Sequence, residues 1–237
     1  IPSVFDEVSC GRANFGVVPV ENSNEGAVSH TLDMFLTSRL AIIAENYLEI
    51  SHDLLSKSGR LQDIKAIYSH PQALAQCRNW LDENLPDIPR IEVPSTARAA
   101  QIVADDESGV AIACGAAANL YGLQVVVNKI EDYHYNYTRF LVIGPEMPAP
   151  SGNDRTSILF SFRDEPGILS KMLEPFRQRG INLMKIESRP VKNTAFEYVF
   201  FLDAAGHITD ADLSAAIEEL KPYCALLKVL GSYPRAR

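Results

Sequence analysis

Small polar side chains gather at two turns of this 237-residue chain, each directly after an apolar run. The first turn is Asn22-Ser23-Asn24, after the run 15–20, and the second is Ser69-His70-Pro71-Gln72, after the run 64–68. If each turn opens a helix, its free N–H groups and the positive end of the helix dipole favour an anion. For either turn alone, the simpler interpretation is that a polar residue only caps a helix. Two such turns in one domain indicate a carboxylate site.

A further pair of candidates is Thr138 and Arg139, which are adjacent in the run 137–143. This run predicts a strand, so the two side chains point to opposite faces. One side chain would face a ligand and the other would face away. From the residues alone, Thr138 as a strand-former and Arg139 as a structural ion-pair partner are at least as well supported as ligand contacts.

Other chemistries find little support in the residues. No two histidines, and no histidine and cysteine, have metal-ligand spacing, so no metal site is expected. The chain has no nucleophile elbow and no glycine-rich phosphate loop. Its 22 basic and 30 acidic residues give a net charge of −8 without a basic stripe, which argues against a nucleic-acid partner. No apolar run reaches the roughly 20 residues of a membrane helix. Four widely spaced cysteines indicate reduced thiols in a cytoplasmic protein.

Apolar runs alternate with helical patterns up to residue 146, which predicts an α/β domain with a parallel, doubly wound sheet. The expected strands are 15–20, 64–68, 90–93, 109–113 and 137–143. Helices are expected after residue 26, from Ser69, from Ser95 through 103, and over 116–121. Ser69 and Ser95 are the expected caps.

The segment 147–154 is rich in proline and polar residues and predicts a linker between domains 1–146 and 155–237. Beyond it, strands are expected at 156–162, 181–188, 196–203 and 225–230. Ile168, Met172 and Phe176 recur at helical spacing, and Thr209 to Asp212 resembles a capping box before a second helix. The order β-α-β-β-α-β is the ferredoxin-like unit.

Several segments, in order along nearly the whole chain, resemble those of the prephenate dehydratases with a C-terminal ACT domain. The segments are Val18-Pro19-Val20-Glu21-Asn22-Ser23, residues 68–77, Asn136-Tyr137-Thr138-Arg139-Phe140, Gly180-Ile181-Asn182-Leu183 and Glu187-Ser188-Arg189-Pro190. The resemblance is greatest to the C-terminal part of the bifunctional chorismate mutase–prephenate dehydratases. It implies a two-lobed, periplasmic-binding-protein-like catalytic domain.

The resemblance also implies a reaction. Prephenate would lose CO2 and its C4 hydroxyl to give phenylpyruvate for phenylalanine synthesis. No cofactor is expected, because aromatisation drives the reaction. The implied catalytic residues are Thr138, Ser69 and Asn22, with Thr138 at the leaving hydroxyl. The implied substrate-binding residues are Ser23, His70, Gln72, Arg139 and Phe140, with His70 as a reserve acid.

For the second domain, the resemblance implies feedback inhibition by L-phenylalanine, bound between the ACT domains of a homodimer or tetramer. The implied effector residues are Gly167, Ile168, Leu169, Ser170, Asn182, Glu187, Ser188, Arg189 and Pro190. Ile168 stands where the family usually has alanine and is expected to narrow the pocket. A simpler interpretation of Arg189 is a surface or interface salt bridge.

Two departures and two alternatives accompany the resemblance. The family's opening strand and glycine-rich turn, and a chorismate mutase bundle, do not occur in this sequence. The first lobe is therefore expected to be incomplete. The alternatives are an arogenate dehydratase, and a non-catalytic fragment that only binds an amino acid.

Overall fold

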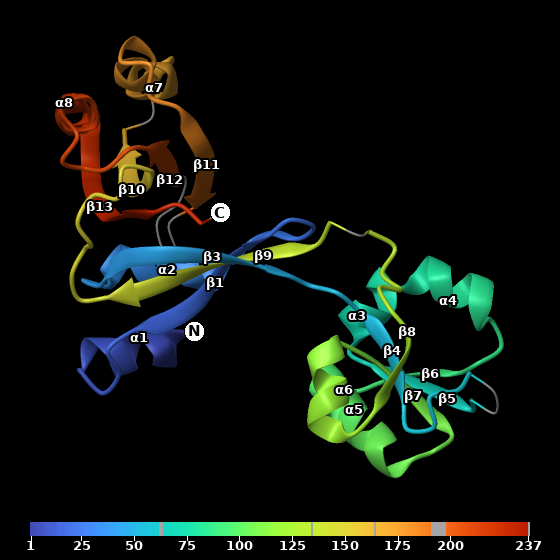
Figure 1. Ribbon diagram of the computed structural model, residues 1–237. Helices are drawn as coiled ribbons and strands as arrows, with labels where there is room; N and C mark the ends of the chain where they lie inside the picture. Colours follow the sequence, from blue (N-terminus) through green and yellow to red (C-terminus); the bar gives the residue numbers. More distant parts are fainter. Residues whose placement is uncertain (62–63, 134, 164, 191–197, 237) are drawn as a thin grey trace. The chain divides into compact units, whose positions relative to one another are not determined.

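The computed structural model describes residues 1–61, 64–133, 135–163, 165–190 and 198–236. Contacts divide the chain into two compact units. One unit is discontinuous and combines Ile1–Leu48 with Thr138–Arg237. The other, Glu49–Tyr137, is inserted between these two segments (Figure 1).

The N-terminal part of the discontinuous unit contains a four-stranded sheet, here called the first sheet, in the order β2-β1-β9-β3. Its elements are α1 (Pro2–Ser9), β1 (Gly16–Asn22), β2 (Gly26–Ala27), α2 (Ser29–Thr37), β3 (Ala41–Glu49) and β9 (Tyr137–Gly144). The expected strands at 15–20 and 137–143 are thus present, and β1 pairs with β9 in the antiparallel sense. Val18 and Val20 are buried while Val17 is exposed. One face of β1 is therefore buried.

The C-terminal part of the same unit confirms the predicted ferredoxin-like order. Its elements are β10 (Asp154–Phe162), α7 (Ile168–Gln178), β11 (Leu183–Pro190), β12 (Tyr198–Ala205), α8 (Ala211–Leu220), a 3-10 turn (Lys221–Tyr223) and β13 (Cys224–Pro234). Their antiparallel sheet, the C-terminal sheet, has the order β11-β12-β10-β13. Residues 196 and 197 of the expected strand 196–203 lie outside the described residues.

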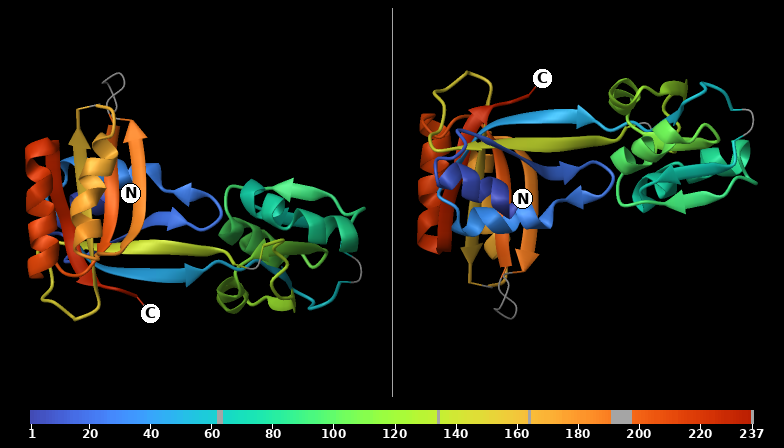
Figure 2. Two further views of the ribbon diagram at one scale, coloured as in Figure 1. Left: turned by 90° about the horizontal axis from the view of Figure 1, so that it is seen from above. Right: turned by 90° about the horizontal axis from the view of Figure 1, so that it is seen from below.

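Helices α7 and α8 cover one face of the C-terminal sheet (Figure 2). Met172 and Phe176 of α7 are fully buried, as their spacing predicts. The predicted capping box is wrong. Asp210 is the N-cap residue of α8, but its carboxylate accepts from the His207 N–H at 2.7 Å, in the preceding turn.

The other face of the C-terminal sheet shares a core with the first sheet. Phe35, Ile42 and Leu141 from the N-terminal part pack in one cluster with Phe201 and Leu230 of the C-terminal sheet. The chain between the two sheets, residues 145–153, contains no helix or strand. The two parts are therefore joined by apolar packing as well as by this segment.

The inserted unit has a five-stranded sheet in the order β6-β5-β7-β4-β8. Its elements are β4 (Asp53–Ser56), β5 (Ala66–Ser69), α3 (Pro71–Gln76), α4 (Arg78–Asn84), β6 (Arg90–Glu92), α5 (Thr96–Asp105), β7 (Gly109–Ala113), α6 (Gly115–Tyr121) and β8 (Gln124–Val127). Only β6, β5 and β7 are parallel to one another, and β4 is antiparallel to β7 and β8.

Two local predictions in the inserted unit have different outcomes. Ser95 caps α5 by accepting from the Arg98 N–H at 3.0 Å, as expected. The helix expected from Ser69 instead begins at Pro71 and breaks at Cys77, with His70 as its N-cap. Among the described residues, no helix is long and apolar enough to span a membrane.

Candidate functional site

The expected catalytic residues Asn22 and Thr138 face each other across β1 and β9. They are register partners in the antiparallel pair, and the Asn22 amide Nδ2 donates to Thr138 Oγ1 at 2.9 Å. Both side chains are partly exposed, so a ligand can reach them. The structure therefore brings these two predicted site residues into direct contact.

The turn after Asn22 fixes the orientation of its amide. Asn22 Oδ1 accepts from the backbone N–H groups of Asn24, at 3.0 Å, and Glu25, at 3.2 Å. The oxygen of this amide is thereby assigned, and its nitrogen must face Thr138. Because Nδ2 only donates, the Thr138 oxygen accepts, and the threonine proton is directed to another group. The sequence predicted that this turn opens a helix. That prediction is wrong, because the turn joins β1 to β2.

The second turn lies in the inserted unit, at the end of β5. Ser69 is fully buried, and its hydroxyl donates to the Ile112 carbonyl on β7 at 2.7 Å. The cap expected of Ser69 is instead supplied by His70, whose Nδ1 accepts from the Gln72 N–H at 3.3 Å. The physical reason is that Ser69 still belongs to the strand and points into the sheet. His70 is partly exposed and Gln72 is exposed.

A polar cluster near this turn was not predicted as a site. His52 Nε2 lies 2.7 Å from Gln76 Oε1, and the Asn136 amide donates to the same oxygen at 3.4 Å. The Glu131 carboxylate accepts from the His52 N–H at 2.8 Å. Gln76 and Asn136 both lie in segments that resemble those of the family. That resemblance is the sequence signal that could have identified them as candidate site residues.

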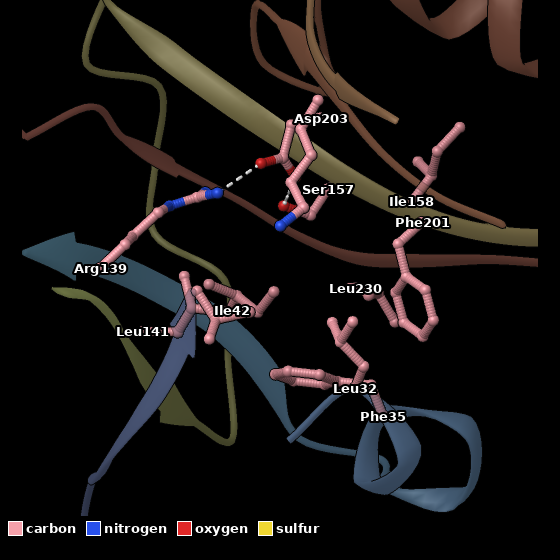
Figure 3. A pocket seen from close by; sticks show the side chains of 12 residues that line it. Leu32, Phe35, Ile42, Arg139, Leu141, Ser157, Ile158, Phe201, Asp203 and Leu230 are labelled. Carbon is pink, nitrogen blue, oxygen red and sulfur yellow. Dashed lines mark hydrogen bonds and ion pairs between the residues drawn. The ribbon is translucent and has the colours of Figure 1, made fainter. Parts of the chain in front are cut away.

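Arg139 lies on the opposite face of β9 from Thr138, in a buried ionic network. Its Nε donates to Glu45 at 2.8 Å, its Nη1 to Asp203 at 2.7 Å and its Nη2 to the Tyr233 hydroxyl at 3.0 Å. Arg155 adds a second bond to Glu45, at 2.9 Å. The structure thus favours the structural interpretation of Arg139 over a ligand contact. Figure 3 shows Arg139 reaching from the first sheet to Asp203 on the C-terminal sheet.

Burial and charge act in opposite directions in this network. Burial alone lowers the pKa of Arg139, but the carboxylates of Asp203 and Glu45 hold its pKa above the ordinary value. Burial also raises the pKa of the Tyr233 phenol, and the nearby Asp203 carboxylate raises it further. Arg139 is therefore always charged and Tyr233 always neutral near pH 7.

Phe140, the next residue on β9, is partly buried and pairs with Pro19 of β1.

The predicted effector residues Gly167, Ile168 and Leu169 line a surface pocket of about 450 Å³ at the start of α7. Phe162 and Phe200 stack at 4.7 Å between ring centroids and form an aromatic wall of this pocket. Gly167, the N-cap residue of α7, has φ +80, which favours glycine, and among the described residues no side chain caps this helix. Ile168 is buried in the core beneath the pocket, and Ser170 follows in the first turn.

The remaining predicted effector residues lie elsewhere. Asn182 follows the far end of α7, and eleven helical residues span roughly 16 Å. On β11, Lys185, Glu187 and Arg189 are on the face toward the first sheet, while Ser188 and Pro190 alternate with them and are exposed. Arg189 lies 3.8 Å from Asp33 of α2 and forms an ion pair with it within this chain.

Comparison with known families identifies two matching regions. Residues 1–148 match the model described as "Prephenate dehydratase", and residues 156–222 match the model described as "ACT domain".

Relatives and solved structures match over almost the full chain. The "Bifunctional chorismate mutase/prephenate dehydratase" of Aquifex aeolicus (strain VF5) is 50% identical over 100% of this chain, which spans 65% of that protein's length. "Arogenate dehydratase 2" of Petunia hybrida is 38% identical over 98% of this chain and 63% of that protein. A prephenate dehydratase from Arthrobacter aurescens, solved in complex with L-Phe, matches with a TM-score of 0.87 and 37% identity. That match covers 100% of this chain and 80% of the other.

Proposed function

Because the chain belongs to the prephenate dehydratase family and carries an ACT domain, we propose that it converts prephenate to phenylpyruvate and is inhibited by phenylalanine. The single observation that best supports catalysis is the Asn22–Thr138 pair. It presents a hydroxyl whose proton is directed away from its asparagine partner.

In the proposed reaction, the C–C bond to the ring carboxylate breaks and its electron pair enters the ring. The C4–O bond breaks at the same time, so the products are CO2, phenylpyruvate and hydroxide. Hydroxide takes up a proton and leaves as water. Thr138 would donate a hydrogen bond to this oxygen and relay the proton, because a threonine hydroxyl is too weak an acid to supply it unaided. A positioned acid typically contributes about 10²–10⁴-fold.

We assign substrate contacts to the partly exposed or exposed Ser23, His70 and Gln72, with Phe140 as a wall of the site. Ser69 and Arg139 receive supporting roles in this proposal. The Ser69 hydroxyl is bonded to Ile112, and the Arg139 guanidinium is bonded to protein groups on each of its nitrogens. Both would hold their strands in place, not touch prephenate.

The proposed phenylalanine site combines the pocket at Gly167 to Leu169, and the adjacent Ser170, with Asn182 of a second copy. Within one chain these residues lie at opposite ends of α7, so a site that uses both needs two ACT domains. The backbone N–H groups at the start of α7 would bind the effector carboxylate, and the Phe162–Phe200 stack would hold its ring. This arrangement supports the predicted homodimer or tetramer. A cytoplasmic location also stays a prediction.

The test is phenylpyruvate formation from prephenate, with and without phenylalanine. Thr138→Ala should lower kcat by about 10²-fold or more, and Thr138→Ser should keep most of it, because the hydroxyl is retained. Thr209→Ala, a threonine beside α8, is the matched control. If Thr138→Ala is folded by circular dichroism and retains the parent's turnover, the catalytic assignment is wrong.

The similarity to an arogenate dehydratase favours a second candidate substrate. Arogenate carries an amino group where prephenate carries a keto group. Comparing kcat/KM for the two substrates separates these functions. A chain that binds phenylalanine and turns over neither substrate would support a non-catalytic amino-acid-binding protein instead.

A further inference from the structure

Lys185 connects β11 to the residue that precedes the candidate catalytic asparagine. Its Nζ lies 3.0 Å from Glu21 Oε2 and 3.3 Å from Glu187 Oε2. The Lys185 side chain is 13% exposed, so this ammonium is largely withdrawn from water. An ion pair at that depth is screened less than one on the surface.

Glu21 lies between two cations that come from different strands. Besides Lys185, it faces Arg139 Nη1 at 3.9 Å. Arg139 is the register partner of Glu21 on β9, and its guanidinium is held by Asp203 of the C-terminal sheet. The Glu21–Arg139 pair is thus attached to the C-terminal sheet at both of its residues.

The next pair along β1 and β9 is Asn22 and Thr138. Successive strand residues point to opposite faces. On each strand, therefore, one residue is fixed by the C-terminal sheet and its neighbour belongs to the candidate catalytic pair. A small shift of Glu21 moves the Asn22 backbone directly and changes the contact of its amide with Thr138.

The same strand that carries Lys185 continues into Glu187 to Pro190, the predicted effector segment. We propose that Lys185 is a positioning residue, which holds the Asn22–Thr138 pair through Glu21 and couples phenylalanine binding to turnover. This inference rests on the proposed function. In this proposal the positive charge of Lys185 attracts Glu21, because their contact is an ion pair without the alignment of a hydrogen bond.

The first variant is Lys185→Met, which keeps the length of the side chain and removes its charge. We expect kcat to fall by about 10-fold with little change in KM, because a misplaced catalytic group affects the chemical step. Inhibition by saturating phenylalanine should fall to less than 2-fold, whereas coupling of this kind is roughly 5–150-fold. The Kd for phenylalanine, measured by calorimetry, should stay within about 3-fold of the parent's value. A larger loss of inhibition then reports lost coupling and not lost binding.

Three further variants make the test specific. Lys185→Arg keeps the charge and should retain inhibition. Lys221→Met removes a lysine from an exposed ion pair with Glu218 in the same domain and should behave like the parent. Glu21→Gln combined with Lys185→Met should be no worse than the more severe single change, because residues that act as a unit are not additive.

Two results would overturn the proposal. The first is that Lys185→Met retains the parent's kcat and inhibition, as is expected of Lys221→Met. The second is that Lys185→Met loses phenylalanine binding in proportion to inhibition. If the parent chain forms no phenylpyruvate, the proposed function fails separately. Amide hydrogen exchange of residues 16–22 then decides the coupling: phenylalanine should change it in the parent and leave it unchanged in Lys185→Met. An identical response in both would refute the coupling.

Discussion

Glu45 is the carboxylate on which the buried ionic network depends. Its side chain has no exposed surface, and Oε2 accepts from both Arg139 at 2.8 Å and Arg155 at 2.9 Å. Oε1 accepts from the Ala236 N–H at 3.2 Å. Glu45→Ala would leave two buried guanidinium groups with one carboxylate fewer. Removing one member of a buried ion pair typically costs about 3–5 kcal/mol.

That cost is large against the total stability of a domain, which is about 5–15 kcal/mol. Each kcal/mol lowers Tm by roughly 2–4 °C in chains of this size, so the melting temperature should fall by roughly 6–20 °C. Urea unfolding followed by far-UV circular dichroism measures the free energy. The chain has one tryptophan, Trp80, and it lies in the inserted unit. Its fluorescence reports separately whether that unit unfolds with the rest.

Glu49→Ala is the matched control, because Glu49 lies on the same strand and pairs with Lys129 at 2.6 Å. Both partners of that pair are about half exposed, and exposed pairs contribute little. The control should unfold at the parent's urea midpoint. If Glu45→Ala also unfolds there, the network does not stabilise this unit, and the account of Arg139 as its central cation is refuted.

Two further predictions concern packing and thiol chemistry. Gly231→Ala should lower Tm clearly, because a Cβ on β13 would collide with the backbone of Ile42 and a backbone cannot rotate away; an unchanged Tm would contradict this packing. Alkylation at pH 8 should label the exposed Cys10 and Cys114 far faster than Cys77 and Cys224, and peptide mass spectrometry after brief labelling measures the ratio. Burial raises the pKa of Cys224 to about 11, so labelling there should keep rising above about pH 9, where an ordinary thiol levels off. This raised pKa also favours the folded state below the unfolded pKa of about 8.5, and that contribution is lost as pH rises toward about 11.

Sequence periodicity predicted the elements whose apolar residues face one core. The α7 pattern and the C-terminal β-α-β-β-α-β order are examples, since Met172 and Phe176 are buried at the expected spacing. It missed α1, β2, β3, β4 and β8. It also predicted a parallel sheet where β4 is antiparallel to its neighbours. Whether two strands run parallel or antiparallel depends on their long-range pairing, which local patterns of apolar residues do not reveal.

Some residues of the candidate site were likewise predicted from the sequence and others were not. The motif residues Asn22 and Thr138 were predicted from the sequence, and the structure joins them by a hydrogen bond. Glu45 was not predicted, although it binds two arginines, because nothing distinguishes one glutamate in a strand from a solvated one. Ser69 was predicted as a cap and is buried in its strand. Whether this hydroxyl points toward a ligand or into the sheet depends on whether the strand ends before or after Ser69. The sequence does not predict the end of a strand to one residue.

Arg139 connects β9 directly to the ACT domain, in addition to the connection through residues 145–153. Thr138 and Arg139 are consecutive, so the strand that presents the candidate catalytic hydroxyl on one face is fixed on the other by Asp203 of the ACT domain. The shared apolar core, in which Phe35 packs with Phe201, prevents the two sheets from sliding independently. A displacement of the C-terminal sheet must therefore break these contacts or move β9 with it. Coupling by such packed contacts predicts a switch between discrete arrangements, because close-packed interfaces do not deform continuously.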